Sequence, residues 1–228
     1  MVMSTTETPT SGKGLRISDI VLLDMDTPED YLYLQSYHRR KSIPTLDECR
    51  QILHETGVGE QVKEHCSMVA VIAKELAARL NQAGAGLDKN LIMAGALLHD
   101  LARSEPDHAQ AGARLLEARG YPLVAAVVGA HMDIEADESH PLTEAEVVFL
   151  ADKMVKGKYI VSVKDRFAAA LKKYQGDPQA CAAVAKRLRQ AELIMLKIEK
   201  IIGRPVESVP APDIHFDKTY CKGDEKYA

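Results

Sequence analysis

Several histidines and aspartates occupy positions that the apolar pattern of the sequence would otherwise assign to a buried core. His99 and Asp100 are adjacent near the end of a segment that is apolar almost all round from Leu91 to Leu101. Burying a carboxylate without a partner costs on the order of several kcal/mol, so the charge must be paired or bound to a metal ion. Three further polar residues lie at otherwise apolar positions: His65, His131 and Asp152.

The spacing of these residues limits how they can share one ion. Adjacent side chains on a helix diverge by about 100°, so His99 and Asp100 can bind together only where their helix faces a cavity. The other ligands must then come from other helices. The sequence therefore predicts a cavity whose other walls carry His65, His131 and Asp152. Such a mixture of imidazole and carboxylate ligands suits a divalent cation.

The elements that would position these residues are almost all helices. Thr45 to Glu48 and Thr143 to Glu146 are capping boxes, and Asp88 is an N-cap candidate. Apolar residues then recur at steps of three and four, as they do on one face of a helix. The predicted helices are 45–57, 62–80 with His65, 88–103 with His99 and Asp100, one opening at Pro106 with His108 in its first turn, 123–131, one from 143 that carries Asp152, 164–174 and 178–202.

The predicted fold class is all-α, a helical bundle with a short N-terminal strand–helix appendage. Residues 1–16 are too polar to offset the entropy of ordering and are expected to be disordered. Residues 17–42 read as a strand ending at Asp24 and a helix capped by Thr27. The main domain is predicted at 43–203, with a polar tail at 204–228 and no strand after residue 37.

Composition excludes some classes of protein. A net charge of −4 gives no global attraction to nucleic acid or anionic lipid, and three Phe with no Trp offer little for base stacking. The four cysteines form no C-x-x-C pair, which argues against a thiolate zinc site and a disulfide scaffold. No leader and no apolar run long enough for a bilayer is recognised. We therefore expect a cytoplasmic protein that binds neither nucleic acid nor membrane, and its oligomeric state stays open.

The order His65, His99-Asp100, Asp152 on successive helices resembles the H…HD…D signature of the HD-domain phosphohydrolases. The resemblance covers about Thr45 to Ile202 and extends to the surrounding residues. The matching stretches are LLHDLAR at 97–103, DHAQAGA at 107–113, AHMD at 130–133 and LADKMVKG at 150–157. A lone HD dipeptide would be a weak signal, whereas ligand types in this order with two additional histidines are specific.

The resemblance implies which residues bind metal. His65, His99, Asp100 and Asp152 would hold a first ion, Asp100 would bridge to a second, and His108 and His131 would complete that second site. Iron or manganese is favoured, while zinc, magnesium and nickel also suit these ligands. Two such cations activate water for attack on phosphorus, with His99 and Asp100 as the catalytic residues. Binuclear relatives carry two consecutive histidines where this chain has His131-Met132, so the number of ions, one or two, stays open.

Cationic residues near the ligands are the candidates for binding substrate phosphate. Arg103 and Lys153 occupy positions at which related enzymes often place phosphate contacts, and Lys156 and Arg166 are further candidates. A solvated charge favoured by a helix C-terminus is the alternative for Arg103 and Lys153. The pocket walls are expected in the loops 104–107 and 133–141. His38, His54, His140 and His215 lack a ligand context and are interpreted as surface residues.

The segment from Asp24 to Asp30 resembles the last strand and helix of molybdenum-cofactor guanylyltransferase-like nucleotidyltransferases. Only some twenty residues match and the nucleotide-binding part is absent, so residues 17–42 are interpreted as a remnant without transferase activity. An ordinary strand–turn–helix is the alternative.

Two functions remain open. The first is a metal-dependent phosphohydrolase that cleaves a phosphoester or phosphoanhydride of a small nucleotide-like substrate. The second is a metal-binding regulatory or accessory module that partners a nucleotidyltransferase domain. The complete ligand set favours the enzyme.

Overall fold

The computed structural model describes residues 27–208, without the side chains of residues 36–40. The chain divides into two compact units, Met1–Arg40 and Lys41–Ala228. Several predictions concern parts of the chain outside the described residues. These are the disorder of residues 1–16, the strand ending at Asp24, the tail from 209 onward, and the surface positions of His215 and the His38 side chain. Within the part described, no helix is long and apolar enough to cross a membrane.

The first unit contributes the described helix α2 (Pro28–Lys41). Its start is the predicted one, since the Thr27 hydroxyl oxygen accepts a hydrogen bond from the Asp30 amide at 3.2 Å. Pro28 is the first helical residue, where its missing N–H is not needed.

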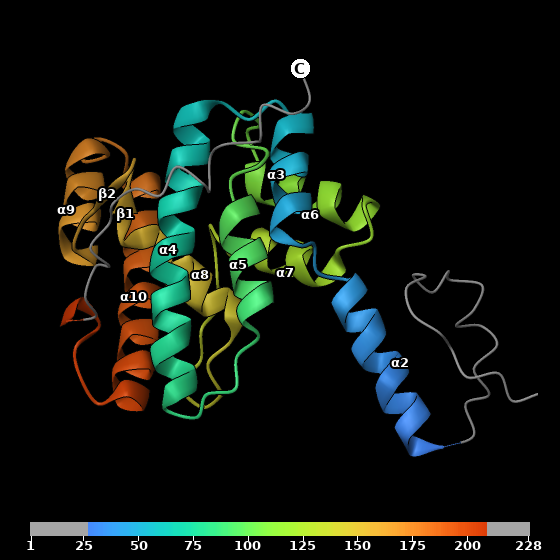
Figure 1. The fold of residues 1–228 in the computed structure, drawn as a ribbon. Coiled ribbons are helices and arrows are strands. Elements are labelled where there is room, and N and C mark those ends of the chain that lie inside the picture. The colour runs from blue at the N-terminus through green and yellow to red at the C-terminus, as the bar shows by residue number, and fades with distance from the viewer. Residues whose placement is uncertain (1–26, 209–228) are drawn as a thin grey trace, which may run out of the picture. The chain divides into compact units, whose positions relative to one another are not determined.

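The second unit is all-α, as predicted (Figure 1). Thr45, Asp88 and Thr143 cap their helices through their side chains, as the sequence indicates. Its helices and strands are α3 (Leu46–Glu55), α4 (Glu60–Gln82), α5 (Lys89–Leu98), α6 (His108–Ala118), α7 (Pro122–Ala130), α8 (Glu144–Lys153), β1 (Val155–Lys156), β2 (Tyr159–Ile160), α9 (Val163–Lys173), α10 (Pro178–Ile202) and the short 3₁₀ helix η1 (Val206–Ser208).

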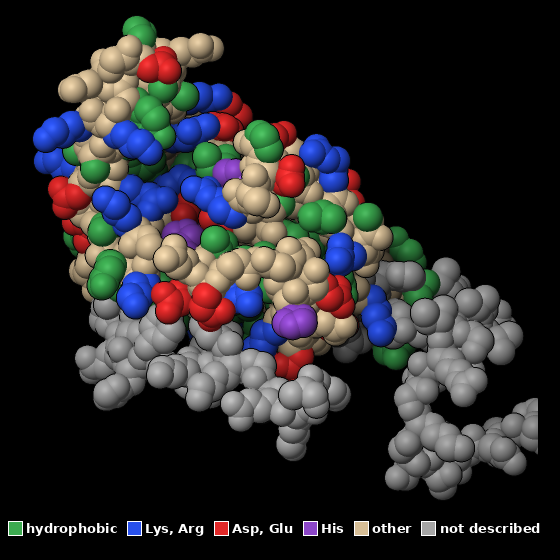
Figure 2. All heavy atoms as spheres, turned by 90° about the horizontal axis from the view of Figure 1, so that it is seen from above, with side chains coloured by type: hydrophobic (Ala, Val, Ile, Leu, Met, Phe, Trp, Pro, Cys, Tyr) green, Lys and Arg blue, Asp and Glu red, His purple; other side chains and the backbone are tan. Residues whose placement is uncertain are grey.

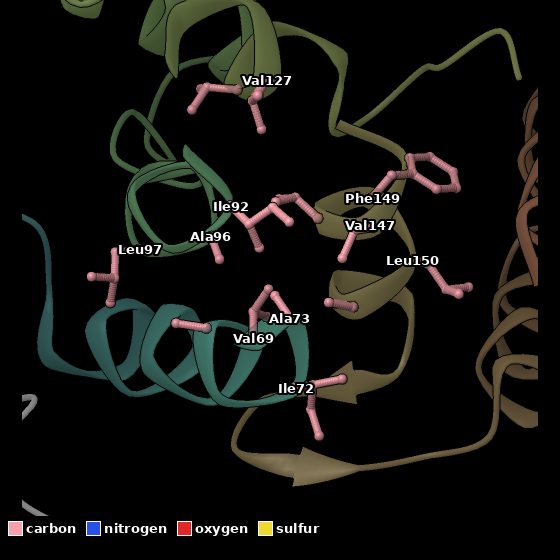
Figure 3. Close-up of a cluster of buried hydrophobic side chains, with 14 of the residues drawn as sticks. Val69, Ile72, Ala73, Ile92, Ala96, Leu97, Val127, Val147, Phe149 and Leu150 are labelled. Atoms are coloured by element: carbon pink, nitrogen blue, oxygen red, sulfur yellow. The ribbon is translucent and has the colours of Figure 1, made fainter. Parts of the chain in front are cut away.

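The core lies where α4, α5, α7 and α8 meet (Figure 3). Val69 of α4, Ile92 of α5 and Phe149 of α8 are fully buried there. Helix α5 is the central helix, because α3, α4, α7 and α8 all pack against it. This explains why its sequence is apolar nearly all round. Helices α9 and α10 pack on each other beside α4 and α8.

Three sequence predictions about secondary structure are wrong in detail. A two-stranded antiparallel hairpin follows α8 and pairs Val155 with Ile160 and Lys156 with Tyr159, although no strand was expected after residue 37. Strands of two residues are too short to show an alternating pattern. Helix α6 begins at His108, with Asp107 as its N-cap, and not at Pro106. Helix α5 ends at Leu98 and not at residue 103, so His99 and Asp100 follow the helix.

Candidate metal centre

Six residues from five helical regions converge on one place. His65 lies on α4, His99 and Asp100 follow the last residue of α5, His108 begins α6, His131 caps the end of α7, and Asp152 lies in the last turn of α8. The four imidazole rings form a continuous row. Ring centroids lie 5.2 Å apart for His65 and His99, 5.1 Å for His99 and His131, and 5.1 Å for His131 and His108. All six predicted ligands are therefore brought together.

The backbone fixes the orientation of three of these histidines. The Nδ1 atom of His65 lies 2.9 Å from the Gly157 carbonyl oxygen, that of His99 2.8 Å from Ala96, and that of His131 2.6 Å from Val128. A carbonyl oxygen only accepts hydrogen bonds, so each Nδ1 must carry the proton and donate it. In the neutral ring the Nε2 atom is then left with a free lone pair.

These lone pairs face carboxylate oxygens. His65 Nε2 lies 3.1 Å from Asp152 Oδ1 and His131 Nε2 lies 3.4 Å from Asp100 Oδ1. The buried His99 Nε2 atom has no hydrogen-bond partner among the described residues. It lies 3.7 Å from Asp100 Oδ2 and 3.9 Å from Asp152 Oδ1. Acceptors that face acceptors in a buried site are stable only with a cation or proton between them. The residues thus fit a bound metal ion.

Two overlapping groups of side chains could each hold an ion. The first is His65, His99 and Asp100, the second is Asp100, His108 and His131, and the ligand atoms of each group lie within 4.8 Å of one another. Asp100 belongs to both groups, as a bridging carboxylate would. Asp152 lies outside both groups, although its Oδ1 atom is close to His65 and His99.

Burial and charge act in opposite directions on the pKa values of the cluster. Burial lowers the pKa of His99 to about 4, so that this ring is neutral at pH 7. Burial also lowers the pKa of His65, but the hydrogen bond that the protonated ring donates from Nε2 to Asp152 outweighs this and raises the pKa overall. Although burial raises the pKa of Asp152, the Lys153 ammonium holds it well below its usual range. The pKa of Asp100 is likewise lowered despite burial, chiefly by the neighbouring His131 ring.

A cavity of about 600 Å³ opens beside the cluster. Figure 2 shows a hollow bordered by Lys and Arg side chains, with acidic and histidine side chains at its base. The four residues predicted to bind substrate all line this cavity, namely Arg103, Lys153, Lys156 and Arg166. The prediction that the loops 104–107 and 133–141 form the pocket walls is wrong, because none of their residues lines the cavity. Residues of α9, α10 and the hairpin line it instead. Apart from Arg166, no residue of α9 or α10 was predicted from the sequence to border the site.

The predicted substrate-binding cations differ in how far they are engaged. Lys153 is buried, and its ammonium donates to Asp152 Oδ2 at 2.6 Å and to the His131 carbonyl at 3.1 Å. Arg166 lies 3.4 Å from Asp152 Oδ1 and also donates to the Val155 carbonyl. Arg103 lies 3.4 Å from Asp100 Oδ1 and 3.1 Å from His108 Nε2. Lys156 is exposed on β1.

Sequence reasoning missed two kinds of residue. Gly157, which turns the hairpin with a φ of 60°, supplies the carbonyl that orients His65. Lys173, Tyr174 and Arg187 line the cavity from α9 and α10. The glycine between two short strands was a turn signal, whereas the placement of α9 and α10 depends on tertiary packing. His54 and His140 are exposed, as interpreted from the sequence.

A helical protein with a buried cluster of histidines and aspartates beside a cationic cavity is a candidate metal-dependent hydrolase. Residues 62–156 match the HD domain family, and this range contains all six clustered residues. This match supports the HD-domain superfamily of metal-dependent phosphohydrolases for this part of the chain, as the resemblance implies.

Two relatives show more distant similarity. A tRNA (cytidine(56)-2'-O)-methyltransferase of Picrophilus torridus is 26% identical over 74% of this chain, which spans 50% of that protein. An uncharacterized protein of Methanocaldococcus jannaschii is 28% identical over 46% of this chain and 73% of its own length. The chain therefore spans about half the length of the methyltransferase it matches. No solved structure matches the chain.

Proposed function

We propose that this chain is a metal-dependent phosphohydrolase that cleaves a phosphoester or phosphoanhydride bond of a small nucleotide-like substrate. The observation that carries the proposal is the set of buried imidazole lone pairs aimed at the carboxylates of Asp100 and Asp152. The match to the HD domain family supports the reaction class. Iron or manganese is the favoured cation, because imidazole and carboxylate together suit these ions.

The proposed metal ligands are His65, His99, Asp100 and Asp152 for a first ion, and Asp100, His108 and His131 for a second. A divalent cation bound there would polarise a phosphoryl oxygen and make a water molecule acidic enough to attack phosphorus. The lowered pKa of His99, about 4, keeps its Nε2 lone pair available at neutral pH. Asp100, the residue shared by both groups, holds the cluster together.

Arg103 and Arg166 would hold the substrate phosphate. Each already lies 3.4 Å from a ligand carboxylate, Arg103 from Asp100 and Arg166 from Asp152. A cation in the cluster would draw these carboxylates toward itself and leave the guanidinium groups for phosphate, which they bind in a bidentate manner. Lys153 instead stays paired with Asp152, and its buried ammonium would orient that carboxylate.

A substrate panel tests the proposal. It contains phosphomonoesters, phosphodiesters, nucleotides and dinucleoside polyphosphates, each assayed with added Mn²⁺ or Fe²⁺. We expect the wild type to hydrolyse at least one class, and His99→Ala and Asp100→Ala to lose at least about a hundredfold in rate, because each removes a metal ligand. His54→Ala is the matched control, since His54 is exposed and outside the cluster. Equal rates in all four proteins would refute the proposal.

A second candidate function is a metal-binding accessory module of an enzyme that acts on nucleotides or RNA. The match to half of a tRNA methyltransferase favours it, and the sequence resemblance of residues 17–42 suggests a nucleotidyltransferase as partner. The same panel separates the two candidates. Stoichiometric metal binding without hydrolysis of any substrate would support the module and exclude the enzyme.

A further inference from the structure

The cavity carries more positive charge than the ligand cluster neutralises. Six cationic side chains line it, namely Arg103, Lys153, Lys156, Arg166, Lys173 and Arg187, against the carboxylates of Asp100 and Asp152. Arg103 pairs with Asp100, and both Lys153 and Arg166 pair with Asp152. Arg187 pairs with Asp133 through two hydrogen bonds of 3.0 Å. Lys156 and Lys173 have no carboxylate partner among the described residues.

Lys173 is the last residue of α9 and lines the cavity there. Its ammonium lies over the ring of Tyr174, 5.1 Å from the ring centroid, and both residues line the cavity. Arg166, which contacts Asp152, lies on the same helix two turns earlier. At 1.5 Å of rise per residue, the two positions are about 10 Å apart along α9. Positive charge is thus present well beyond the reach of a single phosphate at the cluster.

The wall between these two positions is apolar. Phe167, Ala169 and Ala170 of α9 and Val184 of α10 line the cavity, and Phe167 and Val184 are buried. An apolar wall with polar groups at each end is the usual form of a site for a small organic ligand. The excess of Lys and Arg around the hollow in Figure 2 favours an anionic ligand.

We propose that Lys173 forms an outer anion subsite, so that the substrate carries a second phosphate or other anionic group about 10 Å from the one held at Arg166 and the ligand cluster. The apolar wall formed by Phe167, Ala170 and Val184 takes the organic part between the two anionic groups. This inference rests on the proposed function, because it assigns the first anionic group to the hydrolysed phosphate. It selects elongated substrates with two anionic ends over simple phosphomonoesters.

Calorimetric binding of two compounds to the metal-loaded protein tests the subsite. Hexane-1,6-bisphosphonate and hexylphosphonate share an apolar chain and differ in the second anionic group, and their P–C bonds resist hydrolysis. We expect the wild type to bind the bisphosphonate about tenfold more tightly, the value of one good charge-assisted contact. Lys173→Gln should lower this ratio severalfold and leave hexylphosphonate affinity within about twofold.

The matched control is Lys172→Gln, which changes a neighbour of the same charge that does not line the cavity. This variant should keep the wild-type ratio. A wild-type ratio near one, no binding of either compound, or an equal effect of the control would overturn the subsite. If Lys173→Gln lowers the affinity ratio of bisphosphonate to hexylphosphonate but the wild type hydrolyses no substrate, the subsite stands and the proposed function is refuted. If the wild type hydrolyses a substrate but Lys173→Gln leaves this affinity ratio unchanged, the subsite alone is refuted.

Discussion

The chemistry of the cluster depends on which nitrogen of each histidine carries its proton. Three backbone carbonyls, those of Ala96, Val128 and Gly157, each accept a hydrogen bond from an Nδ1 atom. This leaves the Nε2 atoms as acceptors toward Asp100 and Asp152. In metal-binding histidines the second ring nitrogen commonly donates a hydrogen bond to a carbonyl or carboxylate oxygen, which fixes the ring and raises its affinity for the metal.

The burial of neutral His99 makes stability depend on pH. Its pKa is lowered to about 4 in the folded protein from 6.5 in the unfolded chain. The unfolded state therefore binds the proton first, and stability is lost as the pH falls from 6.5 through 4. The raised pKa of His65 acts in the opposite direction, so a variant is needed to isolate His99.

We predict that the free energy of unfolding of the metal-free wild type falls more steeply between pH 7 and pH 5 than that of His99→Gln. The difference should reach about 2 kcal/mol at pH 5, since each pKa unit is worth about 1.4 kcal/mol. Urea unfolding followed by circular dichroism at several pH values measures it. Parallel pH profiles of the two proteins would contradict the lowered pKa.

The identity of the clustered residues could be predicted from sequence, because a charged group in an apolar helical pattern is conspicuous. His65, His99, Asp100, His131 and Asp152 were all found in this way, and His108 from the resemblance. Gly157 and Lys173 could not be found, because a backbone carbonyl carries no side-chain signal and an exposed lysine near the end of a helix is ordinary. Whether the six clustered residues bind metal stays a prediction.

At the scale of elements, capping residues and helical periodicity predicted α3, α4, α8, α9 and α10 closely. The hairpin was missed because its strands contain two residues each. It nevertheless affects the site, since its turn at Gly157 contacts His65 and its Lys156 lines the cavity. The end of α5 at Leu98 is equally important. His99 and Asp100 follow the last residue of this helix, and their side chains lie beside residues in, or at the end of, four other helices, α4, α6, α7 and α8.

Close packing of α5 on α7 gives a prediction for Gly95. A Cβ atom added at Gly95 would lie 2.5 Å from Val127 Cγ1 and 3.3 Å from Val127 Cβ. Gly95→Ala should therefore lower the free energy of unfolding by about 1–3 kcal/mol, the usual cost of overpacking. Thermal or urea unfolding measures the change.

Two variants control for this interpretation. Gly176→Ala adds a methyl group where nothing lies within 4 Å, and it should be close to neutral. Gly95→Ala should cost less in a Val127→Ala background than in the wild type, because Val127→Ala removes the clashing methyl groups. A fully stable Gly95→Ala protein would show that the helices can separate without cost.

At the scale of the whole molecule, the site is assembled from two parts of the chain. The region that matches the HD domain, residues 62–156, contains the six clustered residues. Helices α9 and α10 come after this region and supply the outer wall of the cavity. We infer that the first part determines the reaction class and the second determines which substrate fits.

Helix α10 also holds the segment that follows His131. Arg187 binds Asp133, Gln190 accepts a hydrogen bond from the Ala136 amide at 2.7 Å, and the buried Lys197 donates to Glu146 at 2.6 Å. Lys197 also donates to the Asp137 carbonyl at 3.0 Å. Such long-range contacts join residues that are far apart in sequence, and no local pattern could have predicted them. The predicted domain limits of 43 and 203 stay predictions.

Metal content tests the central claim most directly. The wild type, purified without chelators or nickel affinity resin, should contain or take up anaerobically one or two equivalents of iron or manganese per chain, measured by elemental analysis. His99→Ala and Asp100→Ala should lose most of this metal, because each removes a ligand. A wild-type protein that binds no stoichiometric metal after loading with Fe²⁺ or Mn²⁺ would contradict the account.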